Sequence, residues 1–198
     1  MKKIAITGGI GSGKSLAGKY LSEQGYEVFS CDEIYAELIK SPAYILLIGQ
    51  AFPDVIDNGE INRKKLSEKV FSCKENKARL DNIAHPLIMQ TLFEKMDNAK
   101  GDLVFAEVPL LFENNYQNLF DHSLVILRNL ENRIQAIMQR SDLTKEECLQ
   151  RIATQFDYDT AFQNGRFPKN CSIIINDLDM QNLKEKILLF IDTVKHNL

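Results

Sequence analysis

The segment from Gly8 to Ser15 has the residue types and the spacing of a phosphate-binding loop. Gly8 is followed, after four residues, by Gly13, Lys14 and Ser15, which satisfies the pattern G-x-x-x-x-G-K-[ST]. Glycines let successive backbone N–H groups point inward around an anion, and the N-terminus of a following helix adds partial positive charge. We expect Lys14 to reach the β- and γ-phosphates and the Ser15 hydroxyl to contact Mg²⁺. The pattern therefore predicts that the chain binds ATP or GTP.

The residues on either side of this loop predict the elements that must position it. Residues 3–7 (KIAIT) are short and apolar, as in a buried strand. Residues 14–24 (KSLAGKYLSEQ) predict a helix with Leu16, Tyr20 and Leu21 on one face. The order strand, glycine loop, helix is the structural context that this motif requires. The residues expected to contact the nucleotide are Gly8, Gly9, Ile10, Gly11, Ser12, Gly13, Lys14, Ser15 and Leu16.

Composition narrows the class of protein further. The chain has 198 residues, 44% of them hydrophobic and 26% charged, as expected for one compact α/β unit that could carry small inserted subdomains. The net charge of −3 argues against nucleic acid as a partner. The four cysteines are scattered without a C-x-x-C pair, which favours reduced thiols in the cytoplasm. No signal peptide and no apolar run of ~18 residues is present, so we expect no membrane association. The oligomeric state is left open between a monomer and a small homo-oligomer.

Five apolar runs predict the strands of one sheet. They lie at residues 4–7, 26–30, 103–108, 123–128 and 172–176. Helical patterns separate them, which favours a parallel sheet of about five strands flanked by helices, as in nucleotide kinases that carry a phosphate-binding loop (P-loop). A last helix is marked by an apolar stripe and by an N-cap candidate, Asp179.

Two intervals between these strands are longer than a simple crossover needs. Residues 31–102 are dense in helical pattern, and residues 131–155 form a charged helical pair with a capping box, Thr144-x-x-Glu147. This plan resembles that of a P-loop kinase, in which one insertion holds the acceptor and the other closes over the phosphates. The predicted parts are a nucleotide-binding core (1–32, 101–130 and 170–198), a helical acceptor-binding insertion (33–100) and a lid (131–169).

Other classes of P-loop protein lack support in the sequence. The only Asn-Lys pair, at 76–77, is not followed by the Asp of the guanine-reading N-K-x-D motif, which argues against a regulatory GTPase. Gly9 stands where partitioning ATPases carry a lysine, and the L-S-G-G-Q signature of transporter ATPases is absent. A kinase for a small acceptor remains, with a less specific ATP-binding module as the alternative.

Four further residues have types and positions that suit phosphoryl transfer. Glu107 ends a predicted strand and could hold Mg²⁺ or its water shell, or could simply be solvated. Asp32 follows the second strand and could orient and deprotonate an acceptor hydroxyl, or could cap a helix. Arg140 ends the first lid helix and could contact the transferred phosphoryl group, or could be a surface residue. His85 precedes Pro86, where we expect a helix to begin, and its role stays open between structure and function.

Four motifs, in order, resemble those of the dephospho-coenzyme A kinase family. Residues 6–15 (ITGGIGSGKS) resemble its opening, including a second Gly and an Ile that the general P-loop pattern does not require. Residues 57–72 (DNGEINRKKLSEKVFS) resemble its D-G-x-[LI]-[DN]-R-x-x-L-x-x-x-V-F segment. Residues 83–88 (IAHPLI) and 107–113 (EVPLLFE) resemble its H-P-L-I and [DE]-[IV]-P-L-L-[FY]-E motifs.

The resemblance implies that the γ-phosphoryl group of ATP is transferred, with Mg²⁺, to the ribose 3′-hydroxyl of dephospho-CoA. The products are CoA and ADP, and this reaction is the last step of coenzyme A biosynthesis. The implied catalytic residues are Lys14, Asp32 as the base and Arg140 as the lid arginine. The implied metal-binding residues are Ser15 and Glu107. The implied substrate-binding residues are Asp32, His85, Pro109, Leu110, Leu111 and Phe112.

The chain also departs from the family pattern. Ser30 stands where an Asp is usual, Ala36 and Met89 stand where an Arg is common, and Leu16 replaces a frequent Thr. The match weakens over residues 156–171. These changes bear on affinity rather than on the type of reaction. Two alternatives therefore stay open: another nucleoside or nucleotide kinase of similar architecture, and a weakly active ATP-binding partner protein.

Overall fold

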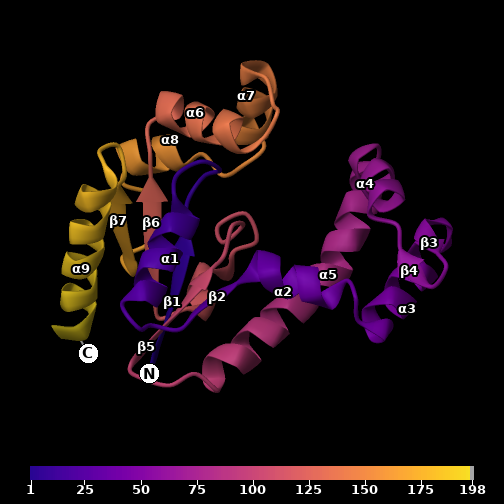
Figure 1. Ribbon diagram of the computed structural model, residues 1–198, viewed down its shortest axis with the longest axis horizontal. Coiled ribbons are helices and arrows are strands. Elements are labelled where there is room, and N and C mark those ends of the chain that lie inside the picture. Colours follow the sequence, from indigo (N-terminus) through magenta and orange to yellow (C-terminus); the bar gives the residue numbers. More distant parts are fainter. Residues whose placement is uncertain (197–198) are drawn as a thin grey trace. The chain divides into compact units, whose positions relative to one another are not determined.

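The structure is a computed structural model that describes residues 1–196 (Figure 1). Its main sheet has five strands in the order β2-β5-β1-β6-β7. β1 pairs in parallel with β5 and β6, and β6 pairs in parallel with β7. The strands are β1 (Lys2–Thr7), β2 (Val28–Ser30), β5 (Leu103–Glu107), β6 (His122–Leu127) and β7 (Cys171–Ile175). The predicted fold class is confirmed.

The chain divides into two compact units. The first contains residues 1–28 and the described part of residues 99–198, and the second contains residues 29–98. The helices of the first unit are α1 (Lys14–Glu23), α6 (Leu130–Arg140), α7 (Lys145–Ala153), α8 (Tyr158–Gln163), α9 (Met180–His196) and the short η2 (Tyr116–Leu119). The elements of the second unit are α2 (Cys31–Leu38), α3 (Pro42–Ala51), η1 (Pro53–Val55), β3 (Ile56–Asp57), β4 (Glu60–Ile61), α4 (Arg63–Phe71) and α5 (Lys74–Asp97). Among the residues described, no helix has both the length and the apolar character needed to cross a bilayer.

The core of the first unit lies on both faces of the sheet. Helices α1 and α9 cover the same face (Figure 1), and their apolar residues pack against alternate residues of the central strands. On the other face, Tyr158 of α8 packs with Val125 and Leu127 of β6. Alternation along β1 explains this arrangement, because successive side chains of a strand point to opposite faces.

The buried face of α1 differs from the prediction. Leu16 is exposed, whereas Ala17, Gly18 and Leu21 are buried against the sheet. Because Ala17 and Gly18 are small, the N-terminal half of the helix can approach the sheet closely. Leu16 was assigned to the apolar face by residue type, but the face that packs on the sheet is the one with Ala17, Gly18 and Leu21, which leaves Leu16 exposed.

The second unit has its own hydrophobic core and two features that the sequence pattern did not predict. Its core centres on Tyr44, Ile48 and Phe52, which are all essentially inaccessible to solvent. Residues 56–61 form a β-hairpin, β3–β4, whose turn residues Asn58 and Gly59 have φ of 51° and 82°. Both central residues at positive φ are typical of a type I′ turn.

The helix expected to begin at His85 begins eleven residues earlier. Helix α5 starts at Lys74 and continues through Pro86 to Asp97. Proline inside a helix removes one backbone hydrogen bond, and here packing of α5 against α2, α3 and α4 compensates for that loss. The prediction of a boundary at Pro86 was wrong because tertiary packing outweighed a local signal.

Candidate functional site

The loop between β1 and α1 ends in a helix N-terminus that no side chain caps. Gly13 is the N-cap of α1, with φ of 102°, and makes no side-chain capping bond. The first turn of α1 contains no acidic residue. The first N–H groups of a helix need partners and carry partial positive charge. This helix start is therefore suited to an anion, as the loop pattern predicts.

Lys14 is folded over the loop that precedes it. Its Nζ donates to the carbonyl oxygens of Gly8, at 2.7 Å, and of Gly9, at 3.1 Å. The ammonium group thus lies next to the backbone that would surround a phosphate. An ammonium on a flexible stem can exchange carbonyl partners for phosphate oxygens when a nucleotide enters.

Ser15 and Glu107 are brought together although they are far apart in the sequence. Ser15 Oγ donates to Glu107 Oε2 at 3.0 Å. Glu107 is the last residue of β5 and is paired in register with Ile6, just before the loop. The carboxylate also lies close to α1, because a Cβ built on Gly18 would be 2.5 Å from Glu107 Oε1. Gly18 therefore leaves the space that this carboxylate occupies.

A hydroxyl and a carboxylate at this position fit Mg²⁺, which prefers oxygen ligands and usually keeps several waters. Among the described residues, no group of three His, Cys, Asp or Glu side chains could hold a metal by itself. A cation at Ser15 and Glu107 would thus take its other ligands from phosphate and water, as Mg²⁺ does at nucleotide sites.

Two of the predicted residues in the second unit have clear local environments. Asp32 is exposed in the first turn of α2, and it does not cap that helix. The N-cap is Ser30, whose Oγ accepts from the Glu33 N–H at 3.4 Å. His85 lies within α5, with Nε2 3.7 Å from Asp81 Oδ1 on the preceding turn. The capping alternative for Asp32 is thereby removed, and the functional roles of both residues stay predictions.

The four residues of the segment 109–112 differ in accessibility. Leu110 is exposed, whereas Leu111 is fully buried. Phe112 packs in an aromatic cluster with Phe156, Tyr158 and Phe167, with ring centroids 4.9–5.9 Å apart. Leu111 has no accessible surface in this structure, so its predicted contact with a substrate would require a rearrangement of this segment. Pro109, the first residue of the segment, is half-buried.

Arg140 is exposed at the end of α6, as the sequence predicts. Its basic side chain in the last turn suits the negative end of the helix dipole. The solvent-exposed position leaves it free to move toward a ligand, and also fits the alternative of a surface residue. Its catalytic role therefore stays a prediction.

The whole chain is similar to known dephospho-CoA kinases. The model of the family described as dephospho-CoA kinase matches residues 2–168. The chain belongs to this family. A dephospho-CoA kinase of Fusobacterium nucleatum is 31% identical over 193 residues, which cover 96% of this chain and 97% of that protein.

Two solved structures agree with this family assignment. A crystal structure from Thermus thermophilus has a TM-score of 0.83 at 29% identity, with 97% of each chain covered. A dephospho-CoA kinase from Campylobacter jejuni has a TM-score of 0.71 at 27% identity, with 99% of this chain and 98% of that one covered. The roles of the loop residues and of Glu107 in phosphoryl transfer stay predictions.

Three side chains that the sequence did not single out hold the loop of this family member. Asn176 Nδ2 donates to the Ser12 carbonyl oxygen at 2.8 Å, and a Cβ on Gly13 would overlap that amide. Gln155 and Arg133 bond the backbone of Ile10. Their residue types are common on helix surfaces, so pattern alone gave no reason to choose them. The extra glycine at position 9 was a signal for Arg133 only, because a Cβ there would overlap its guanidinium.

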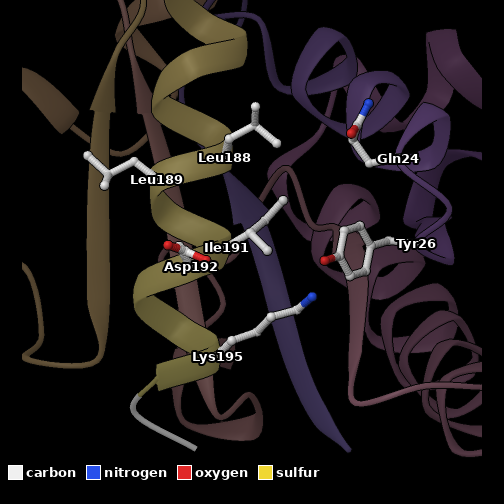
Figure 2. A pocket seen from close by; sticks show the side chains of 7 residues that line it. All are labelled: Gln24, Tyr26, Leu188, Leu189, Ile191, Asp192 and Lys195. Atoms are coloured by element: carbon white, nitrogen blue, oxygen red, sulfur yellow. The ribbon is translucent and has the colours of Figure 1, made fainter.

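One pocket of the first unit lies away from the loop. Its volume is about 480 Å³, and it is lined by side chains of α9 together with Gln24 and Tyr26 (Figure 2). Lys195 extends toward Tyr26, with Nζ 5.4 Å from the centre of the ring. A hydrogen bond with the Tyr26 side chain raises the pKa of Lys195. None of the predicted site residues lines this pocket.

Proposed function

We propose that this chain transfers the γ-phosphoryl group of ATP to the ribose 3′-hydroxyl of dephospho-CoA, giving CoA and ADP. The bond between the γ-phosphorus and the β,γ-bridging oxygen breaks, and a bond from that phosphorus to O3′ forms. The proton of the hydroxyl leaves to a base. Family membership and the pairing of Ser15 with Glu107 beside an uncapped helix start are the observations that support this proposal.

The nucleotide side of the reaction is proposed to use the loop from Gly8 to Leu16. Backbone N–H groups and the start of α1 bind the phosphates, and Lys14 leaves the carbonyls of Gly8 and Gly9 to contact the β- and γ-oxygens. Because phosphoryl transfer passes through a loose transition state, binding and charge neutralisation contribute more than covalent chemistry. Ser15 and Glu107 would hold Mg²⁺, which when bound neutralises charge on the phosphate oxygens.

The acceptor side is proposed to use Asp32 as the group that orients the 3′-hydroxyl and accepts its proton. A loose transition state needs orientation more than a strong base, which suits an exposed carboxylate. His85 and the segment 109–112 are proposed to bind dephospho-CoA. Arg140 is proposed to contact the transferred phosphoryl group.

A panel of acceptors tests the proposal most directly. The purified chain is incubated with ATP, Mg²⁺ and either dephospho-CoA, AMP, GMP or cytidine, and ADP release is followed. We expect turnover with dephospho-CoA, and mass and NMR spectra that identify the product as CoA with its phosphate at O3′. Turnover with a nucleotide or nucleoside instead would favour the alternative kinase, and no ADP above background would favour a binding protein.

Lys14→Ala is the control for the nucleotide side. It is expected to lose turnover with every acceptor, because the β- and γ-phosphates lose the ammonium group of Lys14. Retained ATP-dependent turnover in this variant would contradict the assignment of the loop as the ATP site.

A further inference from the structure

The apex of the phosphate-binding loop is held by two side chains from the segment between β6 and β7. The Ile10 N–H donates to Gln155 Oε1 at 2.7 Å, and the Ile10 carbonyl oxygen accepts from Arg133 Nε at 3.0 Å. Both backbone groups of Ile10 are thus paired within the protein. An amide that already bonds a protein acceptor is not directed at a phosphate, so this pairing determines which way the loop apex faces.

The side chain of Ile10 is anchored in the same segment. It packs against a small hydrophobic cluster formed by Ile134 and Ile137 of α6 and Cys148 of α7. All three cluster residues are buried. The loop apex, α6 and α7 therefore form one packed arrangement, and the loop cannot change shape at Ile10 without moving these contacts.

Arg133 explains the glycine that the general loop pattern does not require. A Cβ built on Gly9 would overlap the Arg133 guanidinium, and one built on Gly11 would lie 2.6 Å from the Arg133 carbonyl oxygen. Gly9 does not have a positive φ, unlike Gly11. The constraint at Gly9 is therefore space and not backbone conformation, and the space is filled by the guanidinium.

The charge of Arg133 is largely removed from water. Arg133 is 4% exposed, and its partner Asp159, with Oδ2 3.6 Å from Nη1, is half exposed. Burial lowers the pKa of Arg133, while Asp159 and Tyr158 favour the charged form. Arginine nevertheless stays protonated in proteins. A fixed positive charge and a fixed hydrogen bond thus lie against the outer side of the loop.

We propose that Arg133 is a positioning residue that holds the loop apex in its phosphate-binding conformation, and that Gly9 is required to admit its guanidinium. The inference rests on the proposed function, because the shape of the loop matters only if the loop binds ATP. Arg133 acts through Ile10 and is distinct from Arg140, which is proposed to contact the phosphoryl group itself.

Binding of ATP, measured by isothermal titration calorimetry without any acceptor, isolates this effect. Arg133→Ala is expected to raise the Kd for ATP about tenfold or more, as for loss of one hydrogen bond to a charged group. Gly9→Ala is expected to do the same, because its Cβ displaces the guanidinium. Arg133→Lys, which keeps the charge but lacks Nε, is expected to lie between the parent chain and Arg133→Ala.

The double variant Gly9→Ala/Arg133→Ala gives the sharpest test. Once the guanidinium is gone, the added Cβ meets no obstacle, so the double variant is expected to bind ATP no worse than Arg133→Ala alone. Such non-additivity is the signature of two groups that act through one contact. Gln135→Ala, an exposed polar residue on the same helix, is the matched control and is expected to leave the Kd unchanged.

Two results would overturn the inference. One is a Kd for Arg133→Ala that stays within about twofold of the parent, the range of an ordinary surface substitution, even if thermal stability falls. The other is a loss in the double variant that equals the sum of the two single losses. If the unaltered chain binds ATP but does not phosphorylate dephospho-CoA, the proposed acceptor is wrong, and these Kd values still decide the role of Arg133.

Discussion

The absence of a side chain at Gly18 leaves room for the carboxylate of Glu107, a predicted metal ligand. Glu107 ends β5, and its carboxylate occupies the space that a Cβ on Gly18 would fill. Glycine is unfavourable inside a helix by about 1 kcal/mol relative to alanine, yet it stands in the middle of α1. The loss in helix stability is explained by the position of the carboxylate, which can then accept from Ser15.

Gly18→Ala is expected to lower activity without lowering the stability of the fold. The added Cβ would push Glu107 away from Ser15, so turnover is expected to fall about tenfold, with a higher Mg²⁺ requirement, as when one charged hydrogen bond is lost. The midpoint of thermal unfolding should stay equal or rise, because alanine favours the helix. Steady-state kinetics at varied Mg²⁺ and a thermal unfolding curve measure both effects. Lys19→Ala, an exposed neighbour on α1, is the control, and parental kinetics in Gly18→Ala would contradict the role given to Glu107.

Asp32→Asn tests the base. Because the amide cannot accept the hydroxyl proton, kcat is expected to fall by ~10² or more, the usual scale of general-base catalysis. The Kd for ATP should be nearly unchanged, since the proposed role concerns the acceptor. Glu33→Gln, which removes the neighbouring carboxylate in the same turn of α2, is the matched control. Equal turnover in Asp32→Asn and the parent chain would remove Asp32 from this role.

Helix α1 stands out among the helices of this chain by how it begins. Seven helices, α2, α3, α4, α6, α7, α8 and α9, start after a residue whose side chain accepts from an N–H of the first turn. Neither α1 nor α5 has such a cap, but α5 has Glu75 in its first turn, whereas α1 has no acidic residue there. Helix stability would favour a cap at the start of α1. Its absence leaves the N–H groups available to an anion.

The start of α7, unlike that of α1, carries a capping box whose expected role is only to stabilise the helix. Thr144→Ala is expected to lower the free energy of unfolding by about 1 kcal/mol at neutral pH. Hydrogen bonds from the Thr144 N–H and hydroxyl lower the pKa of Glu147 below its ordinary value of 4.5. A lowered pKa contributes stability above the unfolded value, and this contribution is lost as the pH falls through the folded value. The difference between Thr144→Ala and the parent, measured by denaturant unfolding, should therefore shrink below pH 4.5; a difference that does not change with pH would contradict the role of Glu147.

At the scale of the whole molecule, the chain has two hydrophobic cores. One lies against the main sheet and supports the loop, and the other is built from α3, α4, α5 and η1 in the second unit. The proposed nucleotide residues from Gly8 to Leu16 belong to the first unit, whereas Asp32 and His85 belong to the second. Nucleotide binding is thus expected to depend on the first core, whereas acceptor binding, which is also proposed to use residues 109–112 of the first unit, is expected to depend on the second core as well.

Ile48→Ala tests this division. Ile48 is fully buried in the second core, and its truncation is expected to cost roughly 2–5 kcal/mol there. Turnover should fall and the KM for dephospho-CoA should rise, while the Kd for ATP, measured by titration, changes little. Leu46→Ala, an exposed residue on the same helix, is the control. A parallel loss of ATP binding would show that the two cores are not independent in function.

The sequence alone determined the fold class, the family and the position of the loop, because these depend on local spacing and on periodic burial. The strand runs, the capping box at Thr144 and the Asp179 cap, which accepts from the Asn182 N–H at 2.9 Å, are all local features and were confirmed. Only the tertiary structure decided which side chains meet across long separations. Ser15 with Glu107 was expected as a pair of metal ligands, but Arg133 on the Ile10 carbonyl was not expected at all. Such contacts depend on how the helices pack on the sheet, so they cannot be predicted from the residue spacing within any one segment.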